Sequence, residues 1–240
     1  MKVMTWNILV GGGGRLAAIE SVVRREKPDI LCLQELRGWP RRAPDLGMSI
    51  HLSPSVFGQP VAVLVRPPLV LTDLKKTRWR LHHAAASATV GDLTVVSAHL
   101  NPFSPYRRYR EARWLSARYG SRRRPVLIAG DLNSLDPATD HTATINRLAP
   151  AYRRRHLGAD GRPDTRAIAA FTAAGFVDLG QGSGASAPTT GLGGPEFSGM
   201  RLDYLLASPP LAARLERIEI LKDAETDYAS DHYPVIAEFS

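Results

Sequence analysis

Short apolar segments of this chain repeatedly run out into side chains of the kinds that bind metal ions or transfer protons. The pattern occurs six times, at Asn7, Glu35, His99, Asp131 with Asn133, Asp203, and Asp231 with His232. Rigid strands present chemical groups in the loops at their ends, although a single polar residue at a strand end is also ordinary turn chemistry. Six cases restricted to these residue types predict a strand-rich scaffold that carries a functional site.

The first two cases belong to one predicted strand–helix–strand unit. Residues 2–7 form a strand, residues 15–26 have apolar side chains at helical spacing, and residues 30–33 form a buried strand. Four glycines, residues 11–14, join the first strand to the helix. They are not followed by Gly-Lys-Ser/Thr, so we expect a flexible loop near the site rather than a phosphate-binding loop.

Strands dominate the next part of the chain, and helices return after it. Residues 60–65 are an apolar strand, and residues 84–90 and 93–99 form a hairpin with a two-residue turn. Residues 180–199 are rich in Gly, Ser, Pro and Thr and form a long loop, of the kind that is usually functional or mobile. The remaining predicted elements are helices 106–119 and 165–174 and strands 125–129, 202–207, 214–221 and 233–239.

Composition is that of an ordinary globular protein. Hydrophobic residues make up 44% and charged residues 22% of the 240 residues, which excludes disorder as the main state. No repeat or linker divides the chain, so we expect one domain over residues 1–240. The chain has no apolar stretch of signal-peptide form or of membrane-spanning length, so we expect a cytoplasmic protein without a membrane span. We also expect it to act as a monomer.

Cysteine and the isolated histidines give weaker signals. Cys32 is the only cysteine, so no disulfide within the chain and no thiolate metal cluster can form. It lies in an apolar run and is expected to be a buried small hydrophobic residue. His82, His83 and His141 have no partner at metal-ligand spacing, and we expect them to be surface or strand residues.

Positive charge favours an anionic partner. The formal net charge is +8, which favours nucleic acid, phosphorylated metabolites or acidic lipid head groups. An excess of arginine with abundant Ala, Gly and Pro is also typical of a GC-rich coding sequence. The arginines cluster on the predicted helix 106–119, at 122–124 and at 153–155. They form either a solvated basic face or a track for a phosphate backbone with aromatic side chains interleaved, and such a track predicts binding that weakens steeply with salt.

The residue types at the strand ends suit one kind of chemistry. Mg²⁺ prefers hard oxygen ligands and is usually held by one or two carboxylates together with water and substrate phosphate oxygens. Glu35, Asp131 and Asp231 can supply those carboxylates, and asparagine can hold a phosphate oxygen or a water without adding charge. Histidine can shuttle a proton or donate to a developing anionic oxygen, and a neighbouring carboxylate stabilises its imidazolium form.

Six motifs carry a resemblance to a known family. They are Thr5-Trp6-Asn7, Leu33-Gln34-Glu35, Ser97-Ala98-His99-Leu100, Gly130-Asp131-Leu132-Asn133, Arg201-Leu202-Asp203-Tyr204 and Ser230-Asp231-His232. With these motifs in family order from position 5 to 232, the chain resembles the endonuclease/exonuclease/phosphatase superfamily, which includes pancreatic-type deoxyribonucleases, apurinic endonucleases, bacterial sphingomyelinases and inositol polyphosphate 5-phosphatases. The resemblance implies an α/β fold, a four-layer α/β sandwich of two packed mixed β-sheets flanked by helices.

The resemblance also implies roles around a metal ion. Glu35 would be the main metal ligand, with Asn7 and Asp231 near the same Mg²⁺ ion, for which Mn²⁺ is the alternative. Asp131 and Asn133 would position or activate the attacking water. The implied reaction is in-line attack of water on phosphorus, without a covalent enzyme intermediate.

The other matching residues would serve the phosphoryl group and the substrate. His232 would contact the scissile phosphate, with Asp203 pairing behind it. His99 matches the histidine of the deoxyribonuclease-like branch of the family. The residues expected to bind substrate are Asn7, Asn101 and Arg107.

Two departures from the family pattern bear on the substrate. Apurinic endonucleases typically carry tyrosine at the position of His99 and tryptophans ahead of the Arg-x-Asp motif, whereas residues 188–194 contain no tryptophan, which argues against abasic-site repair. Deoxyribonuclease-like members pair their first histidine with a glutamate on an earlier strand, and residues 58–63 contain none. His99 is a candidate catalytic residue, but its acid partner is left open, and a hydrogen bond to phosphate alone is the alternative to an acid–base role.

The leading prediction is a metal-dependent phosphodiesterase that acts on DNA or RNA, which the net charge favours. The alternative is a phosphatase or phosphodiesterase that acts on a small phosphorylated metabolite or a phospholipid head group, which a short chain with few insertions to grip a duplex favours. A catalytically silent binding module would have lost ligand residues, and none is lost at Glu35, Asp131, Asn133, Asp203, Asp231 or His232.

Overall fold

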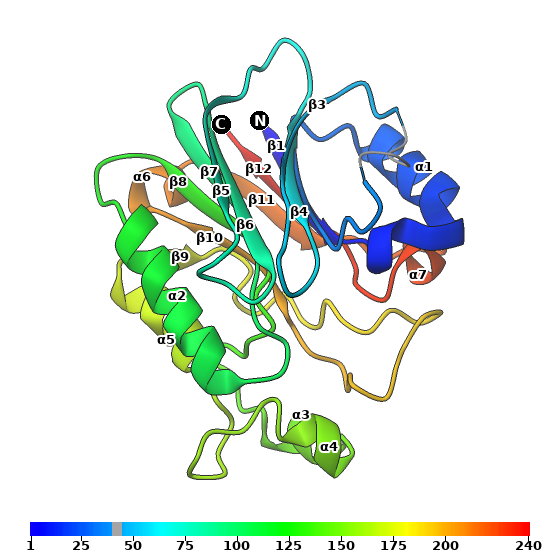
Figure 1. Cartoon of the computed structure of the whole chain (residues 1–240), viewed down its shortest axis with the longest axis vertical. Helices are drawn as coiled ribbons and strands as arrows, with labels where there is room; N and C mark the ends of the chain where they lie inside the picture. Colours follow the sequence, from blue (N-terminus) through cyan, green and yellow to red (C-terminus); the bar gives the residue numbers. More distant parts are fainter. Residues whose placement is uncertain (40–44) are drawn as a thin grey trace.

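The computed structural model describes residues 1–39 and 45–240, which form two β-sheets with helices on their outer faces (Figure 1). The first sheet has the strand order β11-β12-β1-β2-β4-β3, and the second has the order β5-β6-β7-β8-β10-β9. The first contains β1 (Lys2–Asn7), β2 (Ile30–Gln34), β3 (Ser49–Ser53), β4 (Val61–Val65), β11 (Leu215–Ile220) and β12 (Val235–Phe239). The second contains β5 (Thr72–Thr77), β6 (Ala84–Val90), β7 (Leu93–His99), β8 (Val126–Asp131), β9 (Val177–Asp178) and β10 (Asp203–Ala207).

Each sheet is built around one parallel pair of strands joined by a helix. Strands β1 and β2 are parallel and are connected through α1 (Leu16–Glu26), and β7 and β8 are parallel and are connected through α2 (Pro105–Tyr119). A parallel pair requires such a crossover, and it brings both carboxyl ends to the same end of the sheet. Helix α2 begins where Ser104 Oγ accepts the Arg107 N–H and proline occupies the first turn.

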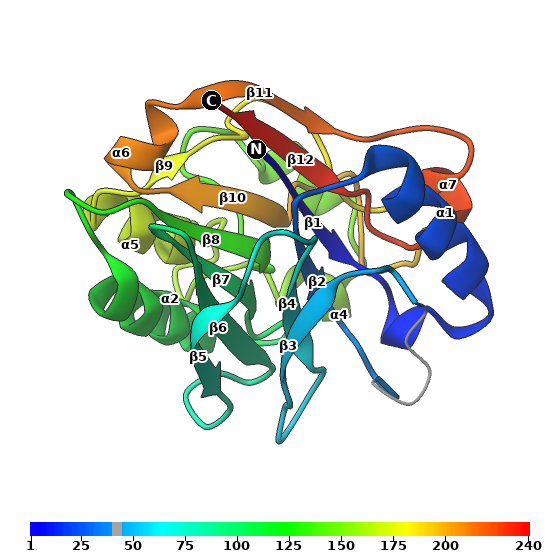
Figure 2. The ribbon, with the colours of Figure 1, turned by 90° about the horizontal axis from the view of Figure 1, so that it is seen from above.

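The molecule has four layers, helix, sheet, sheet and helix (Figure 2). Alternating residues of β4 show how the layers are held. Val61, Val63 and Val65 belong to the core between the two sheets, while Ala62 and Leu64 belong to a second core between the first sheet and α1. A third core lies under α2 and α5 (Arg166–Ala173), against the outer face of the second sheet. Because both faces of each central strand are covered, these strands read as continuous apolar runs.

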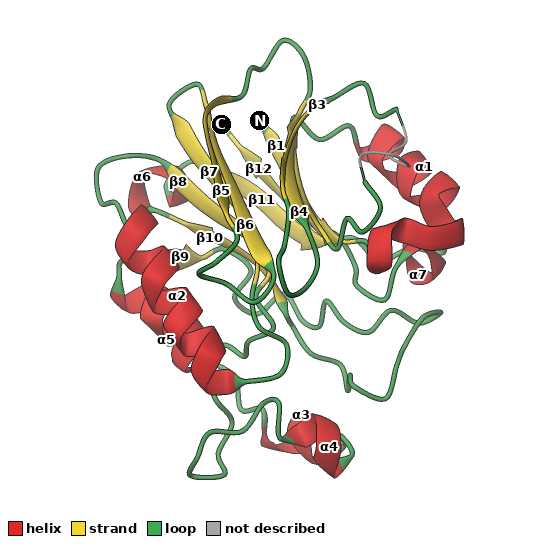
Figure 3. Cartoon of the chain, in the orientation of Figure 1, coloured by secondary structure: helices red, strands yellow, loops and turns green. Residues whose placement is uncertain are grey.

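In the described part of the chain, short α-helices connect the remaining elements. They are α3 (Thr142–Asn146), α4 (Pro150–Arg153), α6 (Pro209–Ala212) and α7 (Thr226–Ala229). Helices α3 and α4 lie beyond the ends of the strands, while α7 lies beside α1 (Figure 3). Over the described part of the chain, none of the helices combines the length and the apolar character that crossing a bilayer requires.

The predicted four-layer α/β sandwich of two mixed sheets is confirmed, and so is the burial of Cys32, which raises the pKa of its thiol. Residues 11–14, expected to be a flexible loop, lie in η1 (Val10–Arg15), where two short 3₁₀ turns meet at a kink and Gly11, Gly12 and Gly13 have non-helical φ and ψ. Gly11 is buried there with a φ of 73°, and a Cβ atom at this position would lie 2.0 Å from the Arg37 carbonyl oxygen. Gly11 therefore packs closely against the segment that follows Glu35, whereas Gly13 and Gly14 are exposed.

Candidate active site

The predicted strand-end residues meet at one end of the two sheets. The carboxyl ends of β1, β2, β7 and β8 and the amino ends of the antiparallel strands β10 and β12 all lie there. A cavity of about 310 Å³ opens between them, which we call the strand-end cavity. The predicted residues that line it are Asn7, Glu35, His99, Asp131, Asn133, Asp231 and His232. Asp203 lies directly behind His232.

A polar contact between the two sheets lies just below this cavity. Gln34 Nε2 donates to Ser97 Oγ at 3.1 Å, and Ser97 Oγ donates to the Leu33 carbonyl at 3.3 Å. Gly130 leaves room for this contact, because a Cβ atom there would lie 3.1 Å from Gln34 Nε2 of the other sheet, as well as 1.9 Å from the Ala98 carbonyl oxygen of the adjacent strand β7. The two halves of the site are thus joined by buried hydrogen bonds as well as by apolar packing.

Glu35, Asn7 and Asp231 form an electronegative corner of the cavity. Glu35 Oε1 accepts from Asn7 Nδ2 at 3.4 Å, and its Oε2 accepts from the Val10 N–H at 2.9 Å. Burial raises the pKa of Asp231, and the nearby charges of Glu35 and Asp131 raise it further while that of His232 opposes them. Carboxylates that raise each other's pKa in this way are stabilised by a cation between them.

Asp131 is the most highly bonded acid of the site. Its Oδ2 accepts from Asn7 Nδ2 at 3.0 Å and lies 3.2 Å from His99 Nε2 and 3.8 Å from His232 Nε2. Its Oδ1 accepts the Asn133 N–H at 2.9 Å. Burial opposes ionisation, but the two histidines and this N–H outweigh it and lower the pKa of Asp131. The carboxylate is therefore held ionised in the cavity wall.

His232 is held by an acid on each side. Its Nδ1 lies 2.7 Å from Asp203 Oδ2, which also accepts the Ser186 hydroxyl at 2.7 Å. Burial lowers the pKa of His232, but Asp203 and Asp131 together raise it well above its usual value. Both carboxylates therefore favour the imidazolium form of His232, which can donate from Nε2 to an anionic oxygen in the cavity.

Two groups of side chains in the described residues have the chemistry to hold a divalent cation. Donor atoms of Asp131, Asp203 and His232 lie within 4.8 Å of one another. In that group, however, the Asp203 and His232 atoms already bond each other, and the Asp203 side chain has no exposed surface. Glu35 and Asp231 instead face the cavity and offer the hard oxygens that Mg²⁺ prefers, so they fit an ion better.

His99 has an acid partner, which the sequence comparison with deoxyribonuclease-like members did not find. The partner is Asp131 on the adjacent parallel strand β8 rather than a glutamate on an earlier strand. Burial lowers the pKa of His99, but Asp131 raises it above its usual value overall. At the place where a glutamate was expected, in residues 58–63, the cavity is lined by Gln59.

His83 is a site residue that sequence reasoning missed. Its ring stacks on that of His99, with centroids 3.8 Å apart and planes 12° from parallel, and it is buried rather than on the surface. Its Nδ1 accepts the Gln59 N–H at 2.7 Å, and burial with the nearby His99 charge lowers its pKa to about 2. The predicted hairpin contained the signal, since its two-residue turn pairs Ala84 with His99 and places His83 one residue beyond.

Two long connections close the cavity. The loop 180–199, predicted to be functional, contributes Glu196 and Phe197, and the Phe197 ring meets that of His232 edge to face at 5.4 Å. The excursion between β8 and α5 contributes Arg155, whose guanidinium stacks over Phe103 at 5.2 Å. Arg155 belongs to the arginine cluster 153–155, but none of these residues lies in a family motif, so only the tertiary structure brings them to the site.

Asn101 and Arg107 lie outside the strand-end cavity. Asn101 Oδ1 accepts the N–H groups of Phe103 and Ser104, both at 2.8 Å, and so shapes the turn that leads into α2. Both residues line a second depression of about 600 Å³, which we call the aromatic groove. It is lined chiefly by Phe57, Trp79, Arg80, His82, Arg107 and Trp114. Their expected contact with substrate stays a prediction.

The fold and the site together define a class, the metal-dependent phosphoesterases built as four-layer α/β sandwiches. A sequence model of the endonuclease/exonuclease/phosphatase family matches residues 4–232, and the chain belongs to this family. It is accordingly a hydrolase that acts on phosphoester bonds. A search of curated protein sequences gave no match.

Solved structures share the fold at low sequence identity. An AP endonuclease from Archaeoglobus fulgidus is 22% identical with a TM-score of 0.75, and the match covers 100% of this chain and 99% of that chain. A 3′-5′ exonuclease from Neisseria meningitidis is 24% identical with a TM-score of 0.72, and the match covers 100% of both chains. A 3′ phosphatase from Neisseria, bound to product DNA hairpin, is 23% identical with a TM-score of 0.71 over 100% and 99% of the two chains.

Proposed function

We propose that this protein is a Mg²⁺-dependent phosphodiesterase that hydrolyses nucleic acid by in-line attack of water, with residues 1–240 acting as one monomeric catalytic domain. The observation that carries the proposal is the setting of Asp131. An ionised carboxylate lies between His99 and His232 and beside the corner formed by Glu35 and Asp231. Acid, base and cation-binding groups therefore surround one small space, as phosphoryl transfer to water requires.

Glu35, Asp231 and Asn7 are the residues that would hold the metal ion, as Mg²⁺ or alternatively Mn²⁺. Their oxygens suit a hard cation, and a cation beside Asp231 relieves the repulsion that raises the pKa of its carboxyl group. When bound, such an ion supplies charge stabilisation to the phosphoryl oxygens. Arg15 lies close to both carboxylates, but its guanidinium donates to the carbonyls of Leu9 and Ala229, each at 2.7 Å.

Asp131 and Asn133 would orient the attacking water. Asn133 Nδ2 donates to the Leu100 carbonyl at 3.2 Å, which leaves its Oδ1 as the acceptor in the cavity. Asp131, being ionised, can accept a proton from the water as it attacks phosphorus. The position of both side chains is set within the site, because the Asn133 N–H bonds Asp131.

His232 and His99 would serve the phosphoryl group. Asp203 keeps His232 protonated, so its Nε2–H can donate to a phosphoryl oxygen whose charge grows in the transition state. His99 lies on the other side of Asp131 and can donate in the same manner or exchange a proton with it. Donors held in place before the reaction need no reorganisation during it.

Two observations support nucleic acid as the substrate. The chain carries a net charge of +8, and phosphodiester backbones are polyanions. One protein of the same fold was solved with a DNA product bound. A small phosphorylated metabolite or lipid head group is the second candidate, favoured by the cavity volume of about 310 Å³, which is the size of a small-molecule site.

A hydrolysis panel tests the proposal. Plasmid DNA, single-stranded DNA, RNA, bis-nitrophenyl phosphate, inositol phosphates and sphingomyelin are each incubated with Mg²⁺ or Mn²⁺ and with wild type, Asp131→Ala or His232→Ala. We expect hydrolysis of a nucleic acid that stops with chelator and falls about 10³-fold in each variant. Turnover of only the small substrates would favour the second candidate, and wild-type rates in both variants would show that the site is elsewhere.

A further inference from the structure

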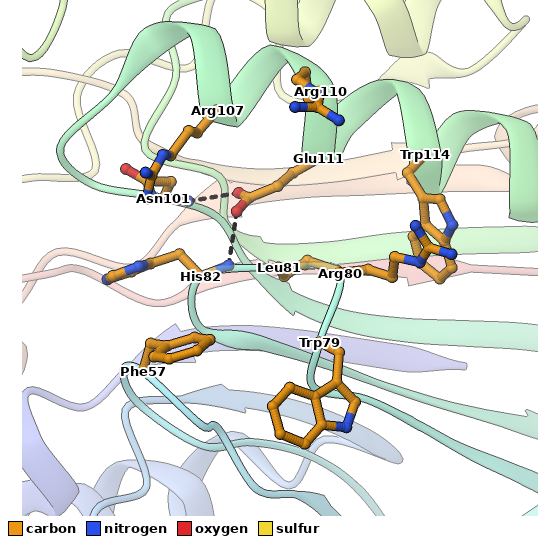
Figure 4. A pocket seen from close by; sticks show the side chains of 10 residues that line it. All are labelled: Phe57, Trp79, Arg80, Leu81, His82, Asn101, Arg107, Arg110, Glu111 and Trp114. Carbon is orange, nitrogen blue, oxygen red and sulfur yellow. Dashed lines mark hydrogen bonds between the residues drawn. The ribbon is translucent and has the colours of Figure 1, made fainter.

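The aromatic groove exposes large apolar side chains beside the strand-end cavity. The Trp79 side chain is 71% exposed and that of Phe57 is 68% exposed. Both project into the open groove from loops between strands, opposite α2 (Figure 4). Exposed apolar surface gathered in a depression marks a binding surface more often than an ordinary stretch of protein surface.

The groove is positively charged. Arg80, Arg107 and Arg110 line it, and within residues 1–39 and 45–240 no carboxylate lies within ion-pair distance of any of them. Glu111 is the single acid in its wall, and Figure 4 shows this carboxylate turned onto the backbone. It accepts the N–H of His82 at 2.7 Å and that of Asn101 at 2.8 Å, and burial raises its pKa to about 7. The groove therefore presents aromatic faces and cations to an anionic ligand.

The groove and the strand-end cavity share one wall. Three chain segments place one residue in the groove and a residue one or two positions further on in the cavity. The pairs are Phe57 with Gln59, His82 with His83, and Asn101 with Phe103. The rings of His82 and Phe103 meet edge to face at 5.5 Å across this wall. A chain molecule bound in the groove would therefore reach the cavity directly.

We propose that the aromatic groove binds an unpaired stretch of nucleic acid next to the scissile phosphate, with bases stacked on Trp79 and Phe57 and phosphates beside Arg80, Arg107 and Arg110. This inference rests on the proposed function for the nature of the substrate. Bases in a duplex are already stacked on one another, so only an unpaired strand can offer their faces to an aromatic side chain. Stacking of this kind tolerates any base sequence, because every base has a π face.

Binding measured without catalysis tests the proposal. A fluorescent oligothymidylate of about 12 nucleotides and a duplex of the same length are titrated with full-length protein in chelator. We expect wild type to prefer the single strand, and Trp79→Ala to weaken that binding about tenfold with little effect on the duplex. Tyr228→Ala is the matched control, since Tyr228 is an aromatic residue that is 64% exposed on α7, in the other helical layer.

The arginines are tested by salt dependence. Each phosphate contact on a single strand contributes about 0.7 to the slope of log affinity against log salt concentration. We expect Arg107→Ala to reduce that slope by about 0.7. Arg217→Ala removes the same charge from β11, at the edge of the first sheet, and should leave the slope unchanged.

The outcomes separate this inference from the proposed function. Wild-type affinity for the single strand in Trp79→Ala, or an equal loss on single strand and duplex, would overturn the groove proposal even if the protein cleaves nucleic acid. A selective loss of single-strand affinity in Trp79→Ala supports the groove, even if no nucleic acid is hydrolysed and the proposed function fails. Because Trp79 is exposed, melting temperatures of the variants should match that of wild type and confirm that they are folded.

Discussion

The strand-end cavity and the aromatic groove are neighbours that are built in opposite ways. In the cavity the polar side chains are buried and bonded to one another. Asp131, for example, contacts Asn7, His99 and the Asn133 N–H at the same time. In the groove, Trp79 is largely exposed and Arg107 has no carboxylate partner among the described residues. Catalysis at one phosphorus atom requires hydrogen-bond donors held in fixed positions. Binding a nucleic-acid strand of any base sequence instead requires a surface that accepts every base.

The largest expected effect separates catalysis from binding. Asp131→Asn keeps the shape of the side chain but removes the charge that His99 and His232 face, so hydrolysis should fall about 10³-fold. Affinity for single-stranded nucleic acid should persist, because the groove is intact. Single-turnover rates and fluorescence titrations with the same oligonucleotide measure both. A parallel loss of affinity would mean that the two regions do not divide the work in this way.

The buried Glu111 in the wall between the groove and the cavity should make the unfolding free energy depend on pH. Because its pKa is raised from 4.5 to about 7, the folded protein retains a proton that the unfolded chain releases between those pH values. Wild type should therefore lose about 3 kcal/mol of unfolding free energy relative to Glu111→Gln as pH rises from 4.5 to 7. Denaturant titrations of both proteins across this range measure the difference. Parallel stability curves would show that Glu111 is not held as the structure indicates.

Asp203→Asn tests whether Asp203 keeps His232 protonated in the strand-end cavity. Asp203 raises the pKa of His232, so the protonated form persists to higher pH, and activity that needs this form is lost as pH rises through that pKa. The variant should move the alkaline limb of the kcat/KM profile to lower pH and reduce the rate near neutral pH about 100-fold. Asp73→Asn, an exposed acid on β5, is the control. An unmoved alkaline limb would show that His232 does not act as the proton donor.

The smallest effect is expected for Arg217→Ala, a control that lies outside both the cavity and the groove. Arg217 pairs with Glu219 at 2.7 Å on β11, where its side chain is 60% exposed. Exposed ion pairs contribute little, so Arg217→Ala should change the unfolding free energy by less than about 0.5 kcal/mol and leave hydrolysis unchanged. Thermal unfolding and initial rates measure this. A larger effect on nucleic-acid affinity would extend the binding surface beyond the groove.

Residues adjacent to strands were predictable, and residues on long connections were not. Asn7, Glu35 and His232 each follow or precede an apolar run, and the runs themselves predict strands. His83 lay within reach of the predicted hairpin but was overlooked, because its partner on the neighbouring strand identifies it only through register. Phe197 comes from a loop with no periodic pattern, so nothing in the sequence relates it to His232.

The pairing of His99 with Asp131 was likewise not predictable from the sequence. The sequence offered no evident acid partner for His99, and it could not say that Asp131 would face this histidine. That pairing depends on the parallel register of β7 and β8 and on the approach of backbones that Gly130 allows. Register is a property of the assembled sheet, so it was not available from local patterns.

The sequence by itself determined the class of fold and the chemical groups of the site. Apolar periodicity predicts strands and helices, and the polar residues at their ends predict a site with oxygen ligands for a metal ion. The four-layer sandwich and the phosphoester hydrolysis were implied by the six motifs that resemble the family. Only the tertiary structure decided which of these groups touch, which loops close the cavity, and that Trp79 and Arg107 line a groove beside it. The physical reason is that contacts between distant segments arise from the packing of two sheets, whereas a sequence pattern records only the environment of each segment.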